Sequence, residues 1–238
     1  MSDINKPIIG IVGRPGIKSN EEKVISIGEY YRLAVVKKGG IPVLILPNQN
    51  SIYESTNPHE IPRMTESEKN DLRKIIDMCD GILMQGGNEW YEYDEFICNY
   101  AINKNIPLLG ICLGMQLMGK VDTNNETASD ISIKNNTNIN HDQKGIKYVH
   151  KVNIDKDSLL YKIIGKHQIE VNSTHNYHIE NTNKFKISAY SEDGLIEALE
   201  LPNNIFTIGV QWHPEKMLEY DESANKIIET FIEKSKKR

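Results

Sequence analysis

The sequence has few of the features that mark membrane-spanning, secreted or nucleic-acid-binding proteins. Its apolar runs are well short of the roughly 18 residues that a transmembrane helix needs, and the polar residues 1–6 do not resemble a signal peptide. Three scattered cysteines make no disulfide framework, which favours a reducing compartment. A formal net charge of only −5 gives no electrostatic reason to expect nucleic acid or an anionic membrane as a partner. We therefore expect a cytoplasmic protein with neither partner.

The sequence has the composition of a globular protein and the alternating strand and helix patterns of the α/β class. With 39% hydrophobic and 26% charged residues, a chain of 238 residues can bury a full core within one domain. Strand-like apolar runs at 7–13 and 42–47 enclose a helical pattern at about 26–38. A capping signature at residues 65–68 predicts a helix to about residue 78. We expect a turn after the first strand, a loop at 48–64, and a loop with short hairpin strands at 120–143. Runs at 81–84 and 106–111 enclose another helical pattern at about 94–104. This β-α-β alternation predicts parallel strands covered by helices on both faces.

The second half of the chain has a different pattern. Short alternating runs predict strands at 147–154, 167–171, 186–190, 196–200 and 206–211. An amphipathic pattern at 222–234 predicts a closing helix. We therefore expect one domain over residues 1–238: a three-layer, flavodoxin-like α/β fold with a mostly parallel sheet and an antiparallel extension.

The stretch around Cys112 carries the strongest chemical signal. The apolar run 106–111 leads into Gly-x-Cys-x-Gly at 110–114, and helix-forming residues follow. Glycines on both sides allow the sharp strand-to-helix turn that exposes a nucleophile at the carboxyl end of a sheet. The N-terminus of the following helix favours thiolate, which lowers the thiol pKa below about 8.5. We interpret Cys112 as a candidate nucleophile, the alternative being a buried structural cysteine, as we expect for Cys79 and Cys98.

A second motif supplies a candidate base. The run 206–211 is followed by Trp212-His213-Pro214-Glu215. Because Pro214 favours an extended residue before it, we expect His213 and Glu215 to project from the same side of the chain. A carboxylate there can orient the imidazole while the other ring nitrogen faces a thiol.

A glycine pair supplies candidate oxyanion donors. Gly86 and Gly87 follow directly on the strand-like run 81–84. Such a pair can turn backbone N–H groups toward a developing negative charge, together with the N–H of Leu113 after the candidate nucleophile. We therefore predict an oxyanion hole made by Gly87 and Leu113.

These motifs resemble those of class I glutamine amidotransferases, whose pattern is G-x-C-x-G-x-Q followed far downstream by H-P-E. Within that superfamily the chain is most similar to the γ-glutamyl-γ-aminobutyrate hydrolase branch, peptidase family C26, from about residue 7 to residue 232. The branch likeness includes residues 7–11, 30–47, 172–178, 193–198 and 211–215. The resemblance implies a Cys112–His213–Glu215 triad, and substrate contacts from Gln116, Gly86 and His175. A structural role is the alternative for His175.

The chain also departs from that branch. The loop after Gly87 is shorter, and Tyr93-Asp94 stands where the branch has an Arg-Asp pair. Residues 121–124 replace a Gly-Gly pair after the elbow helix. We expect Trp90, Tyr91 and Tyr93 to wall the pocket around the leaving amine, ordinary packing being the alternative.

The expected activity is hydrolysis of a γ-glutamyl amide bond through a thioester on Cys112. An α/β-hydrolase places its acid before its histidine, whereas His213 here precedes Glu215. We expect no cofactor and no metal, because Cys112 and His213 lack neighbouring ligands at zinc-site spacing. We expect a small-molecule substrate, and a homo-oligomer is compatible with the sequence. The alternatives are a glutaminase subunit that passes ammonia to a synthetase partner, and a non-catalytic protein that binds γ-glutamyl ligands.

Overall fold

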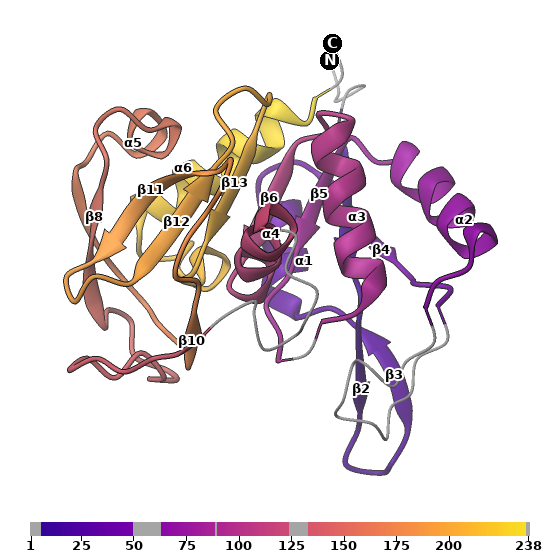
Figure 1. Ribbon diagram of the computed structural model, residues 1–238, viewed down its shortest axis with the longest axis horizontal. Helices are drawn as coiled ribbons and strands as arrows, with labels where there is room; N and C mark the ends of the chain where they lie inside the picture. The colour runs from indigo at the N-terminus through magenta and orange to yellow at the C-terminus, as the bar shows by residue number, and fades with distance from the viewer. Residues whose placement is uncertain (1–5, 50–62, 89, 124–132, 237–238) are drawn as a thin grey trace.

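The computed structural model describes residues 6–49, 63–88, 90–123 and 133–236, which are built around one nine-stranded sheet (Figure 1). Its strand order is β4-β1-β5-β6-β13-β12-β11-β8-β9. The strands from β4 to β13 pair in parallel, and those from β13 to β9 pair antiparallel. This confirms the expected α/β class with an antiparallel extension. In chain order the strands of this sheet are β1 Ile8–Val12, β4 Ile41–Ile45, β5 Gly81–Met84, β6 Leu108–Ile111, β8 His150–Ile154, β9 Gln168–Val171, β11 Lys186–Ser191, β12 Ile196–Glu200 and β13 Thr207–Val210.

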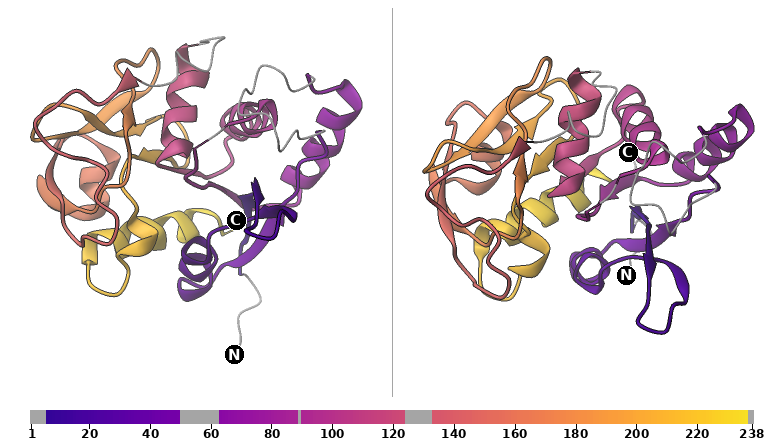
Figure 2. Two further views of the ribbon diagram at one scale, coloured as in Figure 1. Left: turned by 90° about the horizontal axis from the view of Figure 1, so that it is seen from below. Right: turned by 60° about the horizontal axis from the view of Figure 1, so that its bottom comes forward.

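Helices cover both faces of the sheet (Figure 2). They are α1 Glu29–Lys37, α2 Glu66–Asp77, α3 Glu92–Asn103, α4 Leu113–Thr123, α5 Leu159–Ile164 and α6 Glu222–Lys234. Because neighbouring strand residues point to opposite faces, Leu83 and Leu109 join a core with α1, α5 and α6. Ile82 and Leu108 join a second core with α2, α3 and α4. The two cores give the three layers expected from the β-α-β alternation.

Local signals in the sequence explain where α2 begins. Thr65 is its N-cap, and the Thr65 hydroxyl accepts a hydrogen bond from the Glu68 N–H at 3.2 Å. The Glu68 carboxylate accepts the Thr65 N–H at 2.7 Å, which completes a capping box. The capping signature at residues 65–68 is thereby confirmed.

Several predicted boundaries were wrong. A hairpin, β2 Arg14–Ile17 with β3 Lys23–Ser26, replaces the simple turn expected after the first strand. Because Ser26 belongs to that hairpin, α1 begins at Glu29 instead of about residue 26. Helix α3 begins at Glu92, two residues before the expected start, and α4 extends to Thr123 inside the segment expected to be a loop.

The short helix α5 has no counterpart in the expected elements, although its ends carry ordinary signals. The Ser158 hydroxyl accepts the Tyr161 N–H at 2.9 Å, and Gly165 ends the helix with φ +77°. Beyond α4, the small strands β7 Ile133–Lys134 and β10 Tyr177–His178 pair with each other. Most of the loop expected at 48–64, and residues 124–132 of the segment expected at 120–143, lie outside the described residues.

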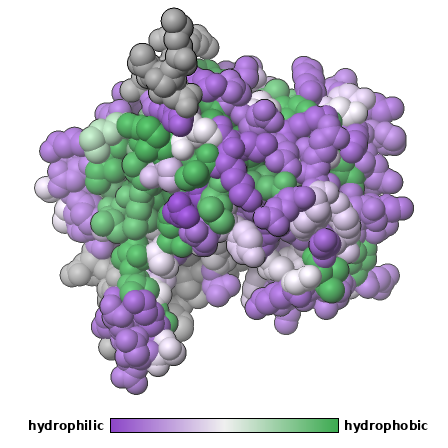
Figure 3. Space-filling view, turned by 180° about the vertical axis from the view of Figure 1, so that it is seen from behind, coloured by the Kyte–Doolittle hydropathy of each residue, from purple (hydrophilic) through white to green (hydrophobic). Residues whose placement is uncertain are grey.

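Apolar side chains are exposed along one edge of the sheet. Tyr30 and Val36 on α1, together with Ile41, Leu44 and Leu46 on or next to β4, are all exposed. Strand β4 is the last strand on this side of the sheet, and Figure 3 shows apolar surface gathered over this region. No helix among the described residues is long and apolar enough to cross a membrane. An uncovered apolar edge is a surface on which a second protein can pack.

Candidate active site

Cys112 stands at the turn between β6 and α4, near the middle of the sheet. Its φ of +55° lies in the left-handed region that residues with a side chain rarely adopt. A Cβ atom at Gly114 would lie 2.3 Å from the Met84 carbonyl oxygen, and one at Gly110 would lie 2.6 Å from Met118 Sδ. Only glycine therefore lets α4 approach β5 and β6 this closely. The strand, turn and helix expected around Cys112 are present.

The surroundings of Cys112 favour a thiolate. Burial raises the thiol pKa and is the largest single influence, but a hydrogen bond and the charge of His213 oppose it. The Leu113 N–H acts in the same direction as His213, and the pKa is lowered overall. The Gln211 amide nitrogen also lies 3.6 Å from the Cys112 sulfur. Thiolate is the nucleophilic form of cysteine.

His213 and Glu215 form a buried hydrogen-bonded pair. His213 Nδ1 lies 2.7 Å from Glu215 Oε1. Burial alone would lower the His213 pKa, but the Glu215 carboxylate and the bond to Cys112 raise it to about 9. The lowered Cys112 pKa and the raised His213 pKa together favour a thiolate beside an imidazolium. Such a pair couples a nucleophile to an acid that can protonate a leaving group.

The local geometry that joins His213 to Glu215 differs from the expected one. The prediction of two extended residues on one side of the chain was wrong. His213 has φ −111° and ψ 78°, and Glu215 lies in the 3₁₀ turn η3, Pro214–Lys216. Because Pro214 suits the first position of such a turn, the chain curls and brings the carboxylate back to the ring.

Two residues around His213 were missed in the sequence. The Asn172 side chain accepts the His213 N–H at 2.8 Å and donates to the His213 carbonyl at 2.9 Å, which fixes this backbone. The Tyr31 hydroxyl accepts the Gly86 N–H at 2.9 Å and lies 3.5 Å from His213 Nδ1. Asn172 belongs to the Asn-Ser-x-His motif and could have been included. Tyr31 gave no signal, because its place beside the site depends on how α1 packs.

The glycine pair lies against the same thiol. A Cβ at Gly86 would lie 3.1 Å from His213 Cε1 and 3.4 Å from Cys112 Cβ. A Cβ at Gly87 would lie 3.3 Å from Leu113 Cδ2, so Gly87 and Leu113 are neighbours. Side chains at residues 86 and 87 would therefore crowd the site. The oxyanion and substrate roles of this pair stay predictions.

A buried ion pair anchors the loop after Gly87. The Arg14 guanidinium on β2 pairs with the Asp94 carboxylate and donates to the Gln85 carbonyl at 3.1 Å. The Asp94 carboxylate also accepts the Tyr91 N–H at 2.9 Å. Where the hydrolase branch has adjacent Arg and Asp residues, this chain thus brings the arginine from a distant hairpin.

The segment 121–124, which replaces the Gly-Gly pair of the hydrolase branch, has a structural role in this chain. Asp122 belongs to the segment that replaces the Gly-Gly pair, and its side chain is buried. Its carboxylate accepts the N–H groups of Lys184 and Phe185 at 2.8 and 3.2 Å. Asp122 therefore holds a turn of the antiparallel extension against α4.

The expected aromatic wall is wrong for Tyr93. This side chain is fully buried, and its hydroxyl donates to the Gly13 carbonyl at 3.0 Å. Its ring stacks on buried Tyr91, with centroids 5.3 Å apart. The Lys120 ammonium lies 3.3 Å from the centroid of the Trp90 ring. Packing in the core, which was the alternative, accounts for Tyr91 and Tyr93.

Gln116 and His175, the other two residues predicted to contact substrate, both interact with neighbouring groups of the protein. Gln116 donates from its amide nitrogen to the Tyr177 carbonyl at 2.9 Å and to Gln211 Oε1 at 3.2 Å. The His175 ring is buried, and its Nε2 lies 3.5 Å from Glu197 Oε1. His175 belongs to a group in the described part of the chain that has the composition of a metal site. Contacts of Gln116 and His175 with a substrate stay predictions.

The thiol pKa of the other two cysteines shifts in the opposite direction. Cys79 and Cys98 are buried, and burial raises the pKa of each thiol, to about 11 for Cys79. Neighbouring carboxylates raise both values further. Of the three thiols, Cys112 alone has a lowered pKa.

Comparisons with known proteins identify the family of the chain. Residues 89–215, which include Cys112, His213 and Glu215, match the peptidase C26 family. The chain is 31% identical over 221 residues to a protein of Schizosaccharomyces pombe named as a glutamine amidotransferase, with 87% of this chain and 81% of that protein covered. It is 29% identical to a protein of Rickettsia prowazekii named as glutamine amidotransferase-like, with 88% and 91% covered.

The chain is also similar to CTP synthases and to solved structures of related proteins. The chain is 30% identical to the CTP synthase of Hydrogenobaculum sp., although it spans 42% of that protein. It resembles the acivicin-bound glutaminase domain of Trypanosoma brucei CTPS with a TM-score of 0.62 and 19% identity, over 97% of this chain and 94% of that one. At that identity the structural likeness shows the fold. The family match and the S. pombe relative together show that the chain belongs to the peptidase C26 family of the class I glutamine amidotransferase-like superfamily.

Proposed function

We propose that the protein hydrolyses a γ-glutamyl amide bond through a thioester on Cys112. The observation that carries the proposal is the meeting of two buried segments. Cys112, whose thiol pKa is lowered, interacts with His213, whose imidazolium pKa is raised and whose Nδ1 lies 2.7 Å from Glu215 Oε1. Peptidase C26 membership supports an amide of the glutamine type as the substrate class. The leaving group is then either ammonia or a larger amine.

In the first half of the reaction, the Cys112 thiolate attacks the γ-carbonyl carbon and the carbonyl oxygen becomes negatively charged. The N–H groups of Leu113 and Gly87 stabilise that oxygen, and one such donor is worth roughly a hundred- to a thousandfold in rate. The imidazolium of His213 then protonates the departing amine as the carbon–nitrogen bond breaks. A γ-glutamyl thioester remains on Cys112.

In the second half, water attacks the thioester. Neutral His213 takes a proton from the water, and a second tetrahedral intermediate forms. Collapse of that intermediate releases glutamate and returns the Cys112 thiolate beside the imidazolium. Glu215 orients the ring through both halves, because its bond to Nδ1 leaves the other nitrogen facing the sulfur.

The test is glutamate release by the purified protein alone. Glutamine and γ-glutamyl amines of increasing size are the substrates, and turnover is expected on at least one of them. Cys112→Ala should abolish the release. Cys79→Ala is the matched control, since it removes a buried thiol elsewhere and should leave turnover intact.

A glutaminase subunit that feeds ammonia to a synthetase is the second candidate. It is favoured by the similarity to CTP synthases and by the exposed apolar side chains around edge strand β4. Its expected result is silence on every γ-glutamyl amine, with glutaminase activity only when a second protein is added. Saturable binding of γ-glutamyl compounds without turnover, with or without a partner, would contradict both candidates and favour a non-catalytic binding protein.

A further inference from the structure

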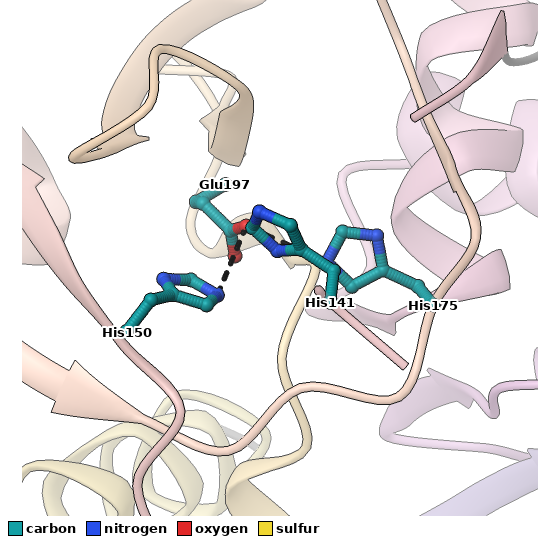
Figure 4. A group of neighbouring side chains, drawn as sticks. All are labelled: His141, His150, His175 and Glu197. Atoms are coloured by element: carbon teal, nitrogen blue, oxygen red, sulfur yellow. Dashed lines mark ion pairs between the residues drawn. The ribbon is translucent and has the colours of Figure 1, made fainter. Parts of the chain in front are cut away.

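Three histidines and one glutamate converge in the antiparallel half of the molecule, and none of them belongs to the Cys112–His213–Glu215 triad. The ligand-type atoms of His141, His150, His175 and Glu197 all lie within 4.8 Å of one another, and all four residues are buried. They come from four separate segments. His150 opens β8, Glu197 lies on β12, and the other two lie in loops (Figure 4).

One nitrogen of each ring faces the same carboxylate. Glu197 Oε1 lies 3.7 Å from His141 Nδ1 and 3.5 Å from the Nε2 atoms of His150 and His175. Figure 4 shows the three rings gathered around that carboxylate. Within the described residues, both Glu197 oxygens and the Nε2 atoms of His150 and His175 lack a hydrogen-bond partner. Buried polar atoms are normally paired, so these four require an explanation.

The opposite side of each ring has an acceptor. The contacts are His141 Nε2 with Asp193 Oδ2 at 3.0 Å, His150 Nδ1 with the Lys151 carbonyl at 3.3 Å, and His175 Nδ1 with the Tyr177 carbonyl at 3.0 Å. A proton on that side leaves a lone pair on the nitrogen that faces Glu197. Carboxylates and carbonyls hold metal-bound histidines in this way.

The spacing does not suit a proton network. Hydrogen bonds between nitrogen and oxygen measure about 2.7–3.2 Å, and a buried carboxylate without such bonds is strongly destabilising. A tetrahedral zinc ion with bonds of about 2.0–2.2 Å sets its ligand atoms roughly 3.3–3.6 Å apart. The separations of 3.5–3.7 Å to Glu197 Oε1 lie close to this range, and a pair of ligand atoms 4.8 Å apart would have to close by about 1.2–1.5 Å.

We propose that His141, His150, His175 and Glu197 bind one zinc ion. Imidazole and carboxylate ligands suit zinc, and four protein ligands make a closed site of the structural type. Each ligand residue is at most 4% exposed, which leaves no side open for a substrate. Three neutral rings and one carboxylate carry a single negative charge, which a dication more than balances.

The bound ion stabilises the loops that border the thiol. The Tyr177 carbonyl, two residues beyond His175, accepts the Gln116 amide at 2.9 Å. The Glu197 carbonyl accepts the Gln211 N–H at 2.8 Å, and the Gln211 side chain contacts the Cys112 sulfur. The zinc site is therefore a support for the active site, outside the reaction itself.

The test is the metal content of the full-length, untagged chain purified without chelators and measured by elemental analysis. About one zinc per chain is expected. Glu197→Gln and His150→Ala should each reduce the content at least tenfold. His167→Ala is the matched control, because His167 is exposed on the same extension and should leave the content unchanged.

A second measurement does not depend on the variants being folded. The wild-type protein is stripped of metal and refilled with Co²⁺, and the intense visible absorption of four-coordinate Co²⁺ is expected, with displacement by one equivalent of Zn²⁺. Absence of stoichiometric metal in both measurements would overturn the site. Stoichiometric iron or manganese in place of zinc would overturn the choice of metal. The readout is independent of turnover, so it stands apart from the proposed hydrolase activity.

Discussion

Among the residues that the structure describes, two buried groups of histidine and glutamate differ in their spacing. In the first, His213 Nδ1 and Glu215 Oε1 are 2.7 Å apart and share a hydrogen bond. In the second, three histidines approach Glu197 Oε1 no closer than 3.5 Å. Both groups consist of histidine and glutamate. The short distance in the first suits proton transfer, and the longer distances in the second suit the proposed zinc ion.

The two groups also differ in where they lie. The first sits at the carboxyl ends of parallel strands β6 and β13, where side chains from neighbouring strands converge. The second lies within the antiparallel extension, where β8 and β12 supply His150 and Glu197 and two loops supply the other histidines. The triad thus depends on the parallel part of the sheet. In the antiparallel extension, the proposed zinc ion joins two loops to two strands. Each prediction below tests one side of this division.

The largest expected effect is on Cys112. Cys112→Ala removes the nucleophile, so kcat/KM on the best γ-glutamyl amide should fall by at least about 10⁴-fold. An electrophilic glutamine analogue should modify the wild-type protein once, at Cys112, as seen by peptide mass mapping. Preferential modification of Cys79 or Cys98 would contradict the assignment, because the pKa of both thiols is raised.

His213 and Glu215 should be unequal partners that act as one unit. His213→Ala removes both base and acid and should lower kcat about 10⁴-fold or more, whereas Glu215→Gln should lower it roughly 10²- to 10⁴-fold. The double variant should be little slower than His213→Ala. Steady-state kinetics on all three variants decide the matter, and losses that simply multiplied would argue against a triad.

Removal of zinc should destabilise the fold, whether or not the thiol of Cys112 is present. A ligand held at a thousand times its Kd contributes about 4 kcal/mol. At roughly 2–4 °C per kcal/mol for a chain of this size, chelation should lower Tm by about 8–16 °C. Calorimetry with and without a chelator measures the shift. Cys112→Ala should show the same shift as wild type, and Glu197→Gln should show almost none.

The pH profile of kcat/KM should be bell-shaped. Because the His213 pKa is raised to about 9, the imidazolium that protonates the leaving amine is lost as pH rises through that value, and the rate falls. At acid pH the rate falls as the Cys112 thiolate gains a proton. Glu215→Gln removes the charge that raises the His213 pKa, so the alkaline limb should move down by about one to two units. An unmoved limb would mean that another group titrates there.

The smallest expected effect is on Tyr31. Tyr31→Phe removes the acceptor of the Gly86 N–H, a hydrogen bond worth about 1 kcal/mol, and a weaker contact 3.5 Å from His213 Nδ1. kcat should fall about three- to tenfold while metal content stays unchanged. A change in metal content would show that the two buried groups are not independent.

Patterns local in the sequence predicted the site better than its surroundings. The Gly-x-Cys-x-Gly turn, the capping box at Thr65 and the β-α-β alternation each lie within one short window, so one sequence was enough to predict them. The pairing of His213 with Glu215 was expected for the wrong reason, because strand alternation was assumed where a 3₁₀ turn forms.

Features that depend on distant segments could not be predicted in this way. The ligands of the proposed zinc site lie at residues 141, 150, 175 and 197, with no short motif among them. Arg14 reaches Asp94 across the fold, and Tyr93 turns into the core instead of toward a pocket. These contacts depend on how helices pack and on which loops meet in the folded protein. Neither produces a periodic pattern in the sequence.

The left-handed backbone at Cys112 has an evolutionary consequence. Any residue with a side chain is strained at φ +55°, by roughly 1–2 kcal/mol, whereas glycine is not. Cys112→Gly would therefore give a chain that is inert and, on backbone grounds, more stable. Selection for folding alone would favour glycine at residue 112, so a cysteine at this position supports the proposed reaction.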